Sequence, residues 1–260
     1  MRVGIVGAGK ISGQYSATIA RLPQLRVAAV ADLDQGRARR LADQHPGARV
    51  VTLPELYAAD AVDVVLNLTT PAAHAGVALA ALAAGKHVYG EKPLAAVSVD
   101  GRAMVDAADA AGLRVACAPD TVLGTGVQTA RSCLDEGSIG VAHAATAFMT
   151  AAGHERWHPD PEFYYQPGGG PLLDMGPYYL TALVHLLGPV ARVTGMSSRP
   201  RDTRTIGSGP RAGSTFPVGV DSQETGILEH ESGALTTVLL SFDIVFVFAC
   251  AVAFPYTLEE

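Results

Sequence analysis

A glutamate, a lysine and a proline stand together at 91–93, directly after an apolar stretch typical of a strand. If Lys92 follows a buried strand, its ammonium can hydrogen-bond a substrate oxygen and stabilise developing alkoxide charge. Partial burial would lower the pKa of the lysine and let it pass a proton as well. Pro93 fixes the turn that follows. The alternative is an ordinary Glu–Lys pair on the surface of a loop.

A second chemical feature is GAGKIS at 7–12, which lies between a predicted strand and a predicted helix. Gly7 permits a tight turn, and Gly9 lets a pyrophosphate approach the backbone at the helix N-terminus. Lys10 and Ile11 belong to the same turn and are expected to contact the cofactor. Ser12 replaces the third glycine of the usual pattern, where a small residue suffices. The motif predicts dinucleotide binding, and a plain glycine turn is the alternative.

Asp32 closes the second predicted strand and indicates which dinucleotide binds. A carboxylate at this place accepts both ribose hydroxyls of NAD and would repel the 2′-phosphate of NADP. We therefore predict NAD, with NADP as the alternative cofactor. The other interpretation of Asp32 is that it caps the following helix.

Polar residues also follow later predicted strands, at the same edge of the sheet. Asn67 and Thr69 end the fourth strand and are expected to bond cofactor hydroxyls, and His74 faces the same end, although it could equally be structural. Glu91 either sets the charge of the neighbouring lysine or contacts the nicotinamide ribose. Asp120 follows the sixth strand and is expected to reach the substrate.

A glycine-rich turn and a helix in the second half carry two further candidates. Gly168–Gly170 allow a close approach of backbone to ligand. Asp174 and Tyr178 are spaced i and i+4, so on a helix they share one face. A nearby Lys92 would lower the pKa of the Tyr178 phenol and make it a proton donor. The alternatives are that Asp174 caps the helix and that Tyr178 packs in the core.

The loop 154–167 contains many side chains that suit a sugar. Flat aromatic faces come with hydrogen-bonding groups: Trp157, Tyr164, Tyr165, His154, Glu155 and His158. Trp157 and Tyr165 are predicted to contact the substrate. A purely hydrophobic lid is the alternative.

Apolar segments alternate with helical ones in the first part of the chain. The predicted strands are 2–6, 26–32, 48–51, 63–69, 86–90 and 113–118. They are apolar on both faces, which is typical of a parallel sheet with helices on either side. Right-handed crossovers make this an α/β, doubly wound Rossmann sheet.

The pattern changes after residue 118. Predicted helices lie at 124–136 and 175–188, and predicted strands lie at 141–149, 191–198, 224–230, 234–242 and 244–254. Residues 199–216 are rich in Arg, Gly, Ser and Pro and predict a mobile loop. We expect a dinucleotide-binding domain at 1–118. A substrate-binding α+β domain with an open, mostly antiparallel sheet should follow at 119–260.

Composition excludes several classes of protein. Apolar residues make up 48% and charged ones 17%, as in globular proteins, and the net charge of −6 gives no support to nucleic-acid binding. Cys117, Cys133 and Cys250 form no CxxC pair, and we predict neither disulfides nor a metal site. The N-terminus has no signal-peptide core, and the apolar run at 244–254 is shorter than the ~20 residues of a membrane span. A cytoplasmic protein without a membrane partner is expected.

Four segments together resemble the Gfo/Idh/MocA oxidoreductases: VGIVGAGKIS, NLTTPAAH, GKHVYGEKPLA and GGGPLLDMGPYY. The likeness covers roughly 1–242. It implies a Rossmann domain for NAD or NADP and a C-terminal domain whose open sheet packs against another subunit, as a homodimer or homotetramer. It also implies oxidation or reduction of sugars, cyclitols or related polyols, with Lys92 and Asp174 catalytic and a cis Lys92–Pro93 bond. Tyr178 stands where the family has a histidine.

Three functions remain open at this point. The first is hydride transfer between the nicotinamide and a polyol, with Lys92 and Tyr178 managing the proton. Members of the family are usually longer, so the resemblance implies a chain shortened at its C-terminus. That feature and Tyr178 favour a second function, a catalytically silent dinucleotide-binding sensor or scaffold. The third is NAD-dependent glycoside hydrolysis, which some relatives perform through a transient oxidation.

Overall fold

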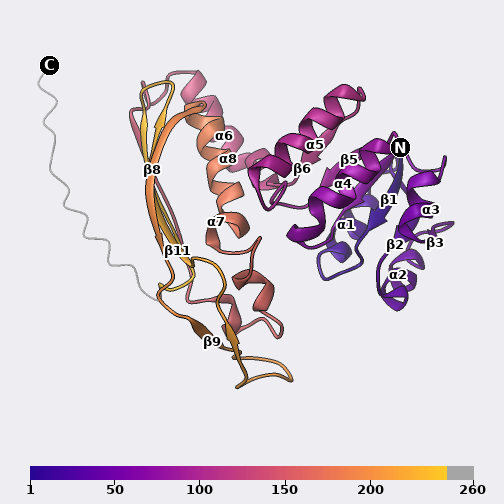
Figure 1. Cartoon of the computed structure of the whole chain (residues 1–260). Helices are drawn as coiled ribbons and strands as arrows, with labels where there is room; N and C mark the ends of the chain where they lie inside the picture. Colours follow the sequence, from indigo (N-terminus) through magenta and orange to yellow (C-terminus); the bar gives the residue numbers. More distant parts are fainter. Residues whose placement is uncertain (245–260) are drawn as a thin grey trace, which may run out of the picture.

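A computed structural model describes residues 1–244 of the chain, and these residues form two large sheets and a separate two-stranded hairpin (Figure 1). The predicted strand at 244–254 lies, apart from Ile244, outside the described residues. Among residues 1–244, no helix combines the length and the apolar character that crossing a membrane requires.

The first sheet is parallel, with the strand order β3-β2-β1-β4-β5-β6 in the described chain. Its strands are β1 (Arg2–Val6), β2 (Arg26–Ala31), β3 (Arg49–Val50), β4 (Val64–Asn67), β5 (His87–Gly90) and β6 (Val115–Cys117). The order reverses between β1 and β4, the switch point beside which such sheets bind ligands. The predicted doubly wound Rossmann sheet is confirmed.

Helices cover both faces of this sheet because its strands are apolar on both sides. The helices are α1 (Ser12–Ile19), α2 (Gln35–Ala42), α3 (Leu53–Ala58), α4 (His74–Ala83), after a short 3₁₀ turn η1 (Pro71–Ala73), and α5 (Ser98–Ala110). Residues of α3, α4 and α5, such as Leu56, Leu82 and Met104, pack on one face. Residues of α1 and α2, such as Ile19 and Leu41, pack on the other.

The second sheet has the order β7-β12-β11-β8 within residues 1–244. The strands of this sheet are β7 (Ala144–Thr150), β8 (Val190–Ser198), β11 (Gln223–His230) and β12 (Leu235–Ser241). The helices of the same part of the chain are η2 (Asp120–Leu123), α6 (Thr125–Asp135), η3 (His154–Arg156), η4 (Glu162–Tyr165), α7 (Pro171–Asp174) and α8 (Gly176–Leu187). β11 pairs antiparallel with β8 and β12, whereas β12 pairs parallel with β7. The predicted mostly antiparallel sheet is confirmed, with one parallel pair in addition.

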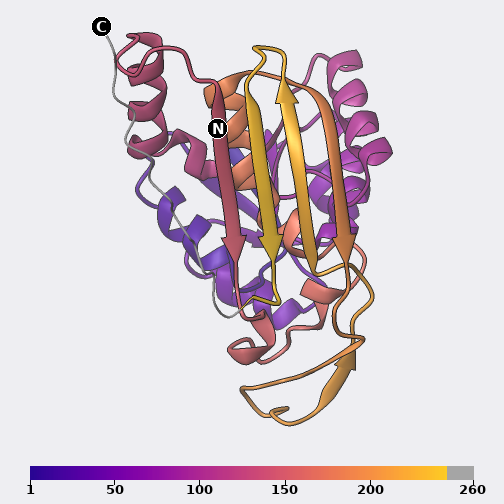
Figure 2. The ribbon, with the colours of Figure 1, turned by 90° about the vertical axis from the view of Figure 1, so that its left-hand side faces the viewer.

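The two faces of the second sheet differ. α8 packs on the inner face, where its Leu183 meets Leu228, Val238 and Leu240. Figure 2 shows the opposite face toward the viewer, with the described helices behind the sheet. Strand register aligns Met196, Thr225, Leu239 and Phe148 in one row across this open face. Met196 is 80% exposed and Phe148 is 55% exposed, so the row presents apolar surface to solvent.

Residues 199–216, predicted as a mobile loop, contain the ordered hairpin of β9 (Thr203–Thr205) and β10 (Thr215–Pro217). Arg204 in β9 is buried, and its guanidinium donates to Glu155 Oε1 (2.8 Å) and Asp243 Oδ1 (2.6 Å). It also lies 4.6 Å from the ring centre of Tyr165. The prediction was wrong because a buried arginine with two carboxylate partners anchors the segment.

Candidate active site

The glycine turn between β1 and α1 has the two properties expected of a dinucleotide loop. Gly7 has φ +97°, and a Cβ there would lie 2.7 Å from the Leu68 carbonyl oxygen, so the turn packs directly against the end of β4. A Cβ at Gly9 would meet nothing within 4 Å. The N-terminus of α1, after Ile11, has no side-chain cap, so no capping side chain competes with an anion there, although the Ser12 and Gln14 N–H groups already donate to the Gly9 and Ile11 carbonyls. The residues present therefore fit a pyrophosphate at this turn.

Asp32 is tied to the same turn. Its carboxylate accepts the N–H of Ala8 and the N–H of Asp34, each at 2.6 Å, and its side chain is 10% exposed. Asp34, not Asp32, caps α2 by accepting from Gly36 and Arg37. The helix-cap alternative for Asp32 therefore does not hold.

Asn67 and His74 are both buried, so the expected bonds from Asn67 to cofactor hydroxyls gain no support, and the structural alternative for His74 fits its surroundings. Asn67 is buried, and its amide bonds the His74 carbonyl and the Thr69 hydroxyl. His74 is also buried, with its two ring nitrogens 2.7 Å from the Pro93 carbonyl and 3.1 Å from the Thr69 carbonyl. Both side chains hydrogen-bond to backbone carbonyls between β4 and Pro93. They therefore hold in place the backbone that lies beneath the site. Thr69 is half-buried beside them.

Lys92 lies just beyond β5 and reaches Asp174 at the end of α7. Its Nζ donates to Asp174 Oδ1 at 2.6 Å and to the Asp174 carbonyl at 2.7 Å. The two side chains are 16% and 13% exposed. The Lys92–Pro93 peptide bond is cis, as the resemblance implied. An ammonium has three N–H donors, so one remains for a substrate oxygen.

Glu91 pairs with α1 rather than with the lysine ammonium. Its Oε1 accepts the Tyr15 hydroxyl at 2.7 Å, and its Oε2 accepts the Lys92 backbone N–H at 3.0 Å. Tyr15 follows the glycine turn, so this bond joins the turn directly to the segment that carries Lys92. Sequence reasoning missed Tyr15, because nothing in its spacing relates it to position 91.

Burial and charge set the ionisation of Asp174. Burial alone would raise the pKa of its carboxyl, but the hydrogen bond from His154 and the charge of Lys92 outweigh burial and hold that pKa below its usual value. Asp174 ends α7, and α8 begins at Gly176, so Asp174 is not a helix cap and shares no continuous helix with Tyr178.

The Tyr178 phenol has a raised pKa, not the lowered one that we predicted. Burial, then the charges of Glu91, Asp120 and Asp174, raise the pKa of Tyr178 to about 12. Lys92 Nζ lies 5.4 Å from the ring centre, and its charge is already paired with Asp174. Tyr178 therefore keeps its proton at neutral pH. Asp120 is exposed at the start of η2.

The predicted substrate loop divides into an exposed and a buried part. Trp157 is 54% exposed, and Lys10 of the glycine turn lies 5.3 Å from its ring centre. Tyr165 is fully buried, where its hydroxyl donates to Glu155 and accepts the His154 N–H. Its predicted contact with substrate is therefore corrected: Tyr165 belongs to the core around Arg204.

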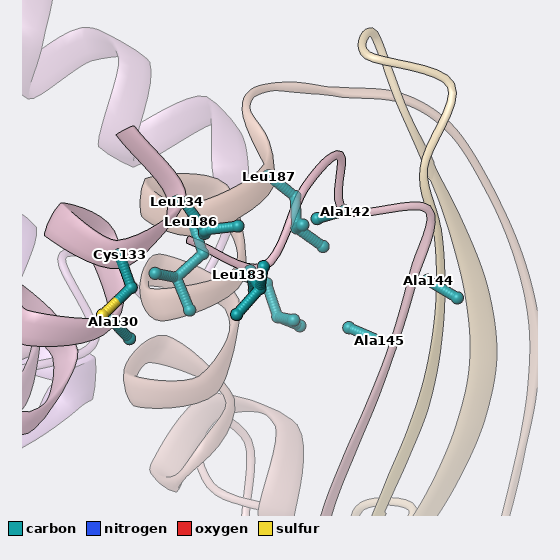
Figure 3. A pocket seen from close by; sticks show the side chains of 10 residues that line it. Ala130, Cys133, Leu134, Ala142, Ala144, Ala145, Leu183, Leu186 and Leu187 are labelled. Carbon is teal, nitrogen blue, oxygen red and sulfur yellow. The ribbon is translucent and has the colours of Figure 1, made fainter. Parts of the chain in front are cut away.

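An apolar groove of about 380 Å³ lies apart from these residues, between α6, α8 and β7 (Figure 3). Its lining includes Cys133, Leu134, Leu183 and Leu187, and every lining side chain is apolar. Nothing there would orient a hydroxylated substrate. Within residues 1–244, no group of three His, Cys, Asp or Glu side chains is placed to hold a metal ion.

Comparison with known proteins adds independent information. Residues 1–118 match the family GFO/IDH/MocA, described as an oxidoreductase family with an NAD-binding Rossmann fold, and residues 127–248 match its C-terminal domain. A dTDP-3,4-didehydro-2,6-dideoxy-alpha-D-glucose 3-reductase of Streptomyces violaceoruber is 32% identical, over 88% of this chain and 67% of its own length.

Solved structures show the same fold. An NAD-binding oxidoreductase from Klebsiella pneumoniae superposes with a TM-score of 0.81 at 27% identity, over 94% of this chain and 67% of that one. GenD2 from gentamicin A biosynthesis, in complex with NAD, gives 0.78 at 25% identity, over 95% and 67%. The chain spans about two thirds of the length of each of these relatives.

Proposed function

The chain belongs to the GFO/IDH/MocA family of oxidoreductases, and we propose that it transfers hydride between NAD and a hydroxyl or carbonyl group of a sugar, cyclitol or related polyol. One observation carries the proposal. Asp174 fixes the Lys92 ammonium at the carboxyl end of β5. The same segment is bonded through Glu91 to Tyr15 of α1, the helix that follows the dinucleotide turn. A proton-handling group thus stands beside the predicted place of the cofactor.

The side chains divide the work with the cofactor. The cofactor, when bound, would accept the hydride as NAD⁺ or supply it as NADH. The free N–H of Lys92 holds the substrate oxygen and stabilises negative charge on it. The Tyr178 phenol stays protonated at neutral pH and donates a proton to that oxygen when a carbonyl is reduced. Asp120 and Trp157, both exposed near these groups, are the proposed substrate contacts.

The cofactor is held by the turn between β1 and α1. Gly7, Gly9, Lys10 and Ile11 are proposed to receive the pyrophosphate, with Asp32 receiving the adenosine ribose. Thr69 and Glu91 are proposed to line the nicotinamide end. The open backbone at Gly9 and the uncapped α1 support this assignment.

Replacing Asp32 with asparagine is expected to reduce the preference for NAD over NADP by about tenfold. Asparagine keeps an oxygen for the Ala8 N–H, so the turn stays in place, but the charge that repels a 2′-phosphate is gone. The ratio of the dissociation constants for the reduced forms, NADH and NADPH, from dihydronicotinamide fluorescence, measures the change. Asp34→Asn, which keeps the α2 cap, is the matched control. An unchanged ratio in Asp32→Asn would remove Asp32 from cofactor selection.

A thermal-shift screen followed by a turnover assay tests the function itself. A ligand that binds the folded state raises the melting temperature, so NAD is expected to stabilise the protein and a panel of sugars and cyclitols to add to its effect. Compounds that bind are then assayed for NADH formation or consumption. Binding of NAD without turnover of any panel member would favour a dinucleotide-binding sensor. Release of an aglycone without net NADH would favour glycoside hydrolysis.

We further propose that 1–118 and 119–260 act as separate domains for cofactor and substrate, and that the second forms a homodimer or homotetramer through its open sheet. Residues 245–260 lie outside the described residues. The exposed apolar row over β8, β11, β12 and β7 supports an interface, because monomers rarely expose contiguous apolar patches.

Charging this face is expected to dissociate the oligomer. The variant Phe148→Glu with Ile227→Glu places two carboxylates on β7 and β11, where the side chains are 55% and 48% exposed. Light scattering should then report a monomer. Val99→Glu on α5, at a more exposed apolar site (71%), should leave the oligomer intact. A wild type that is already monomeric would contradict the proposal.

A further inference from the structure

We propose that His154 is a positioning residue for the Lys92–Asp174 pair, an inference that rests on the proposed function. Its Nε2 lies 3.4 Å from Asp174 Oδ2, while Lys92 Nζ takes Oδ1 at 2.6 Å. The carboxylate is thus held by one group on each oxygen. All three side chains are no more than 16% exposed.

The backbone around His154 is fixed before its ring is considered. Gly153 has φ +107°, and a Cβ there would collide with the Glu155 carboxylate, so glycine is required. The His154 N–H donates to the Tyr165 hydroxyl at 2.9 Å. Glu155 is held in turn by Arg204 and Tyr165. The hydrogen bonds around the buried Arg204 therefore fix the position of the His154 backbone.

The ring itself is packed among aromatic side chains. Its centre lies 4.3 Å from that of Tyr164, 4.4 Å from that of Phe242 and 5.4 Å from that of Trp157. Nδ1 is buried and has no hydrogen-bond partner among the described residues. A phenyl ring would fill this space without leaving a buried nitrogen unsatisfied, so packing does not explain a histidine. The contact between its Nε2 and Asp174 explains why a histidine stands here.

This contact matters because Asp174 must stay ionised while largely buried. Burial disfavours its charged form, and the donors on its two oxygens offset that cost. Among the described residues, Tyr164 from η4 and Tyr178 from α8 also face it; burial is the main cause that raises their pKa values, and the charge of Asp174 adds to it. If Asp174 took up a proton, Lys92 would lose its anionic partner and the geometry that presents its third N–H.

Carboxyl-carbon NMR of the full chain, with ¹³Cγ-labelled aspartate, tests the idea without any substrate. Asp174→Asn assigns the signal. In His154→Phe, which keeps the aromatic packing, the titration midpoint of Asp174 should rise by about one unit. In His154→Gln, whose amide can still donate, the rise should be smaller. His158→Gln, a histidine of the same loop whose ring bonds the Asp160 N–H, should leave the midpoint unchanged.

Enzyme kinetics provide a second test of the role of His154. Turnover that needs the Asp174 carboxylate is present above its folded pKa and is lost as the pH falls through it. Removing the His154 donor raises that pKa, so the acid limb of kcat/KM should move to higher pH in His154→Phe. A folded His154→Phe and His154→Gln with the wild-type Asp174 midpoint would overturn the inference. If wild type turns over nothing, the proposed function fails, while the NMR midpoint still decides the role of His154.

Discussion

Lys92→Met lowers kcat/KM by about three orders of magnitude while NAD still binds: this is the expected result, from the magnitudes of charge stabilisation and of acid–base catalysis. Methionine keeps most of the stem but removes all three N–H donors. The substrate oxygen then loses its stabilising charge, whereas the glycine turn that holds the pyrophosphate is unchanged. Steady-state NADH absorbance gives kcat/KM, dihydronicotinamide fluorescence gives the NADH dissociation constant, and competition against NADH gives that of NAD.

Lys86→Met is the matched control for this variant. Lys86 precedes the opposite end of β5 and donates to the Ala59 carbonyl, away from Asp174. It should retain wild-type turnover. Since methionine at 92 leaves Asp174 without its ammonium, both variants are compared at temperatures where each is folded. Turnover within a few-fold of wild type in a folded Lys92→Met protein would exclude the amine from the reaction.

The second large effect concerns stability. Arg204→Met is expected to reduce the free energy of unfolding by about 3–5 kcal/mol, because it leaves buried carboxylates without their cation. The Arg204 side chain is 1% exposed, and those of Glu155 and Asp243 are 6% exposed. Urea unfolding followed by circular dichroism measures the loss.

Arg211→Met provides the comparison, because Arg211 also pairs with two carboxylates, Asp160 and Glu162, but lies at the surface. Its removal should shift the urea midpoint far less, as exposed ion pairs contribute little. Equal shifts in the two variants would show that the buried network is not what stabilises the hairpin of β9 and β10.

The first sheet could be predicted from sequence because its signals are local. The strand at 2–6 coincides with β1, and the turn at Gly7 lies where the motif placed it, whereas the cis bond at Lys92 was implied by the family resemblance. One local signal was overlooked: Thr52 and Glu55 form a capping box that opens α3, in the recognisable T-x-x-E pattern.

What could not be predicted depends on contacts between distant segments. Residues 199–216 have the composition of a mobile loop, yet Arg204 is buried because Glu155 and Asp243 meet it from elsewhere in the chain. Tyr165 and its neighbour Tyr164 are both aromatic, and composition does not show that Tyr165 turns into the core. The approach of His154 to Asp174 likewise follows from folding and not from spacing.

The bond from position 92 to position 174 joins one half of the chain to the other. Each half supplies one member of the pair, so a half expressed alone would carry an uncompensated charge at the surface where the other should dock. Recombination between related genes at the junction near residue 118 is therefore constrained. An exchanged second half can yield a working chimera only when it brings a carboxylate to meet the amine.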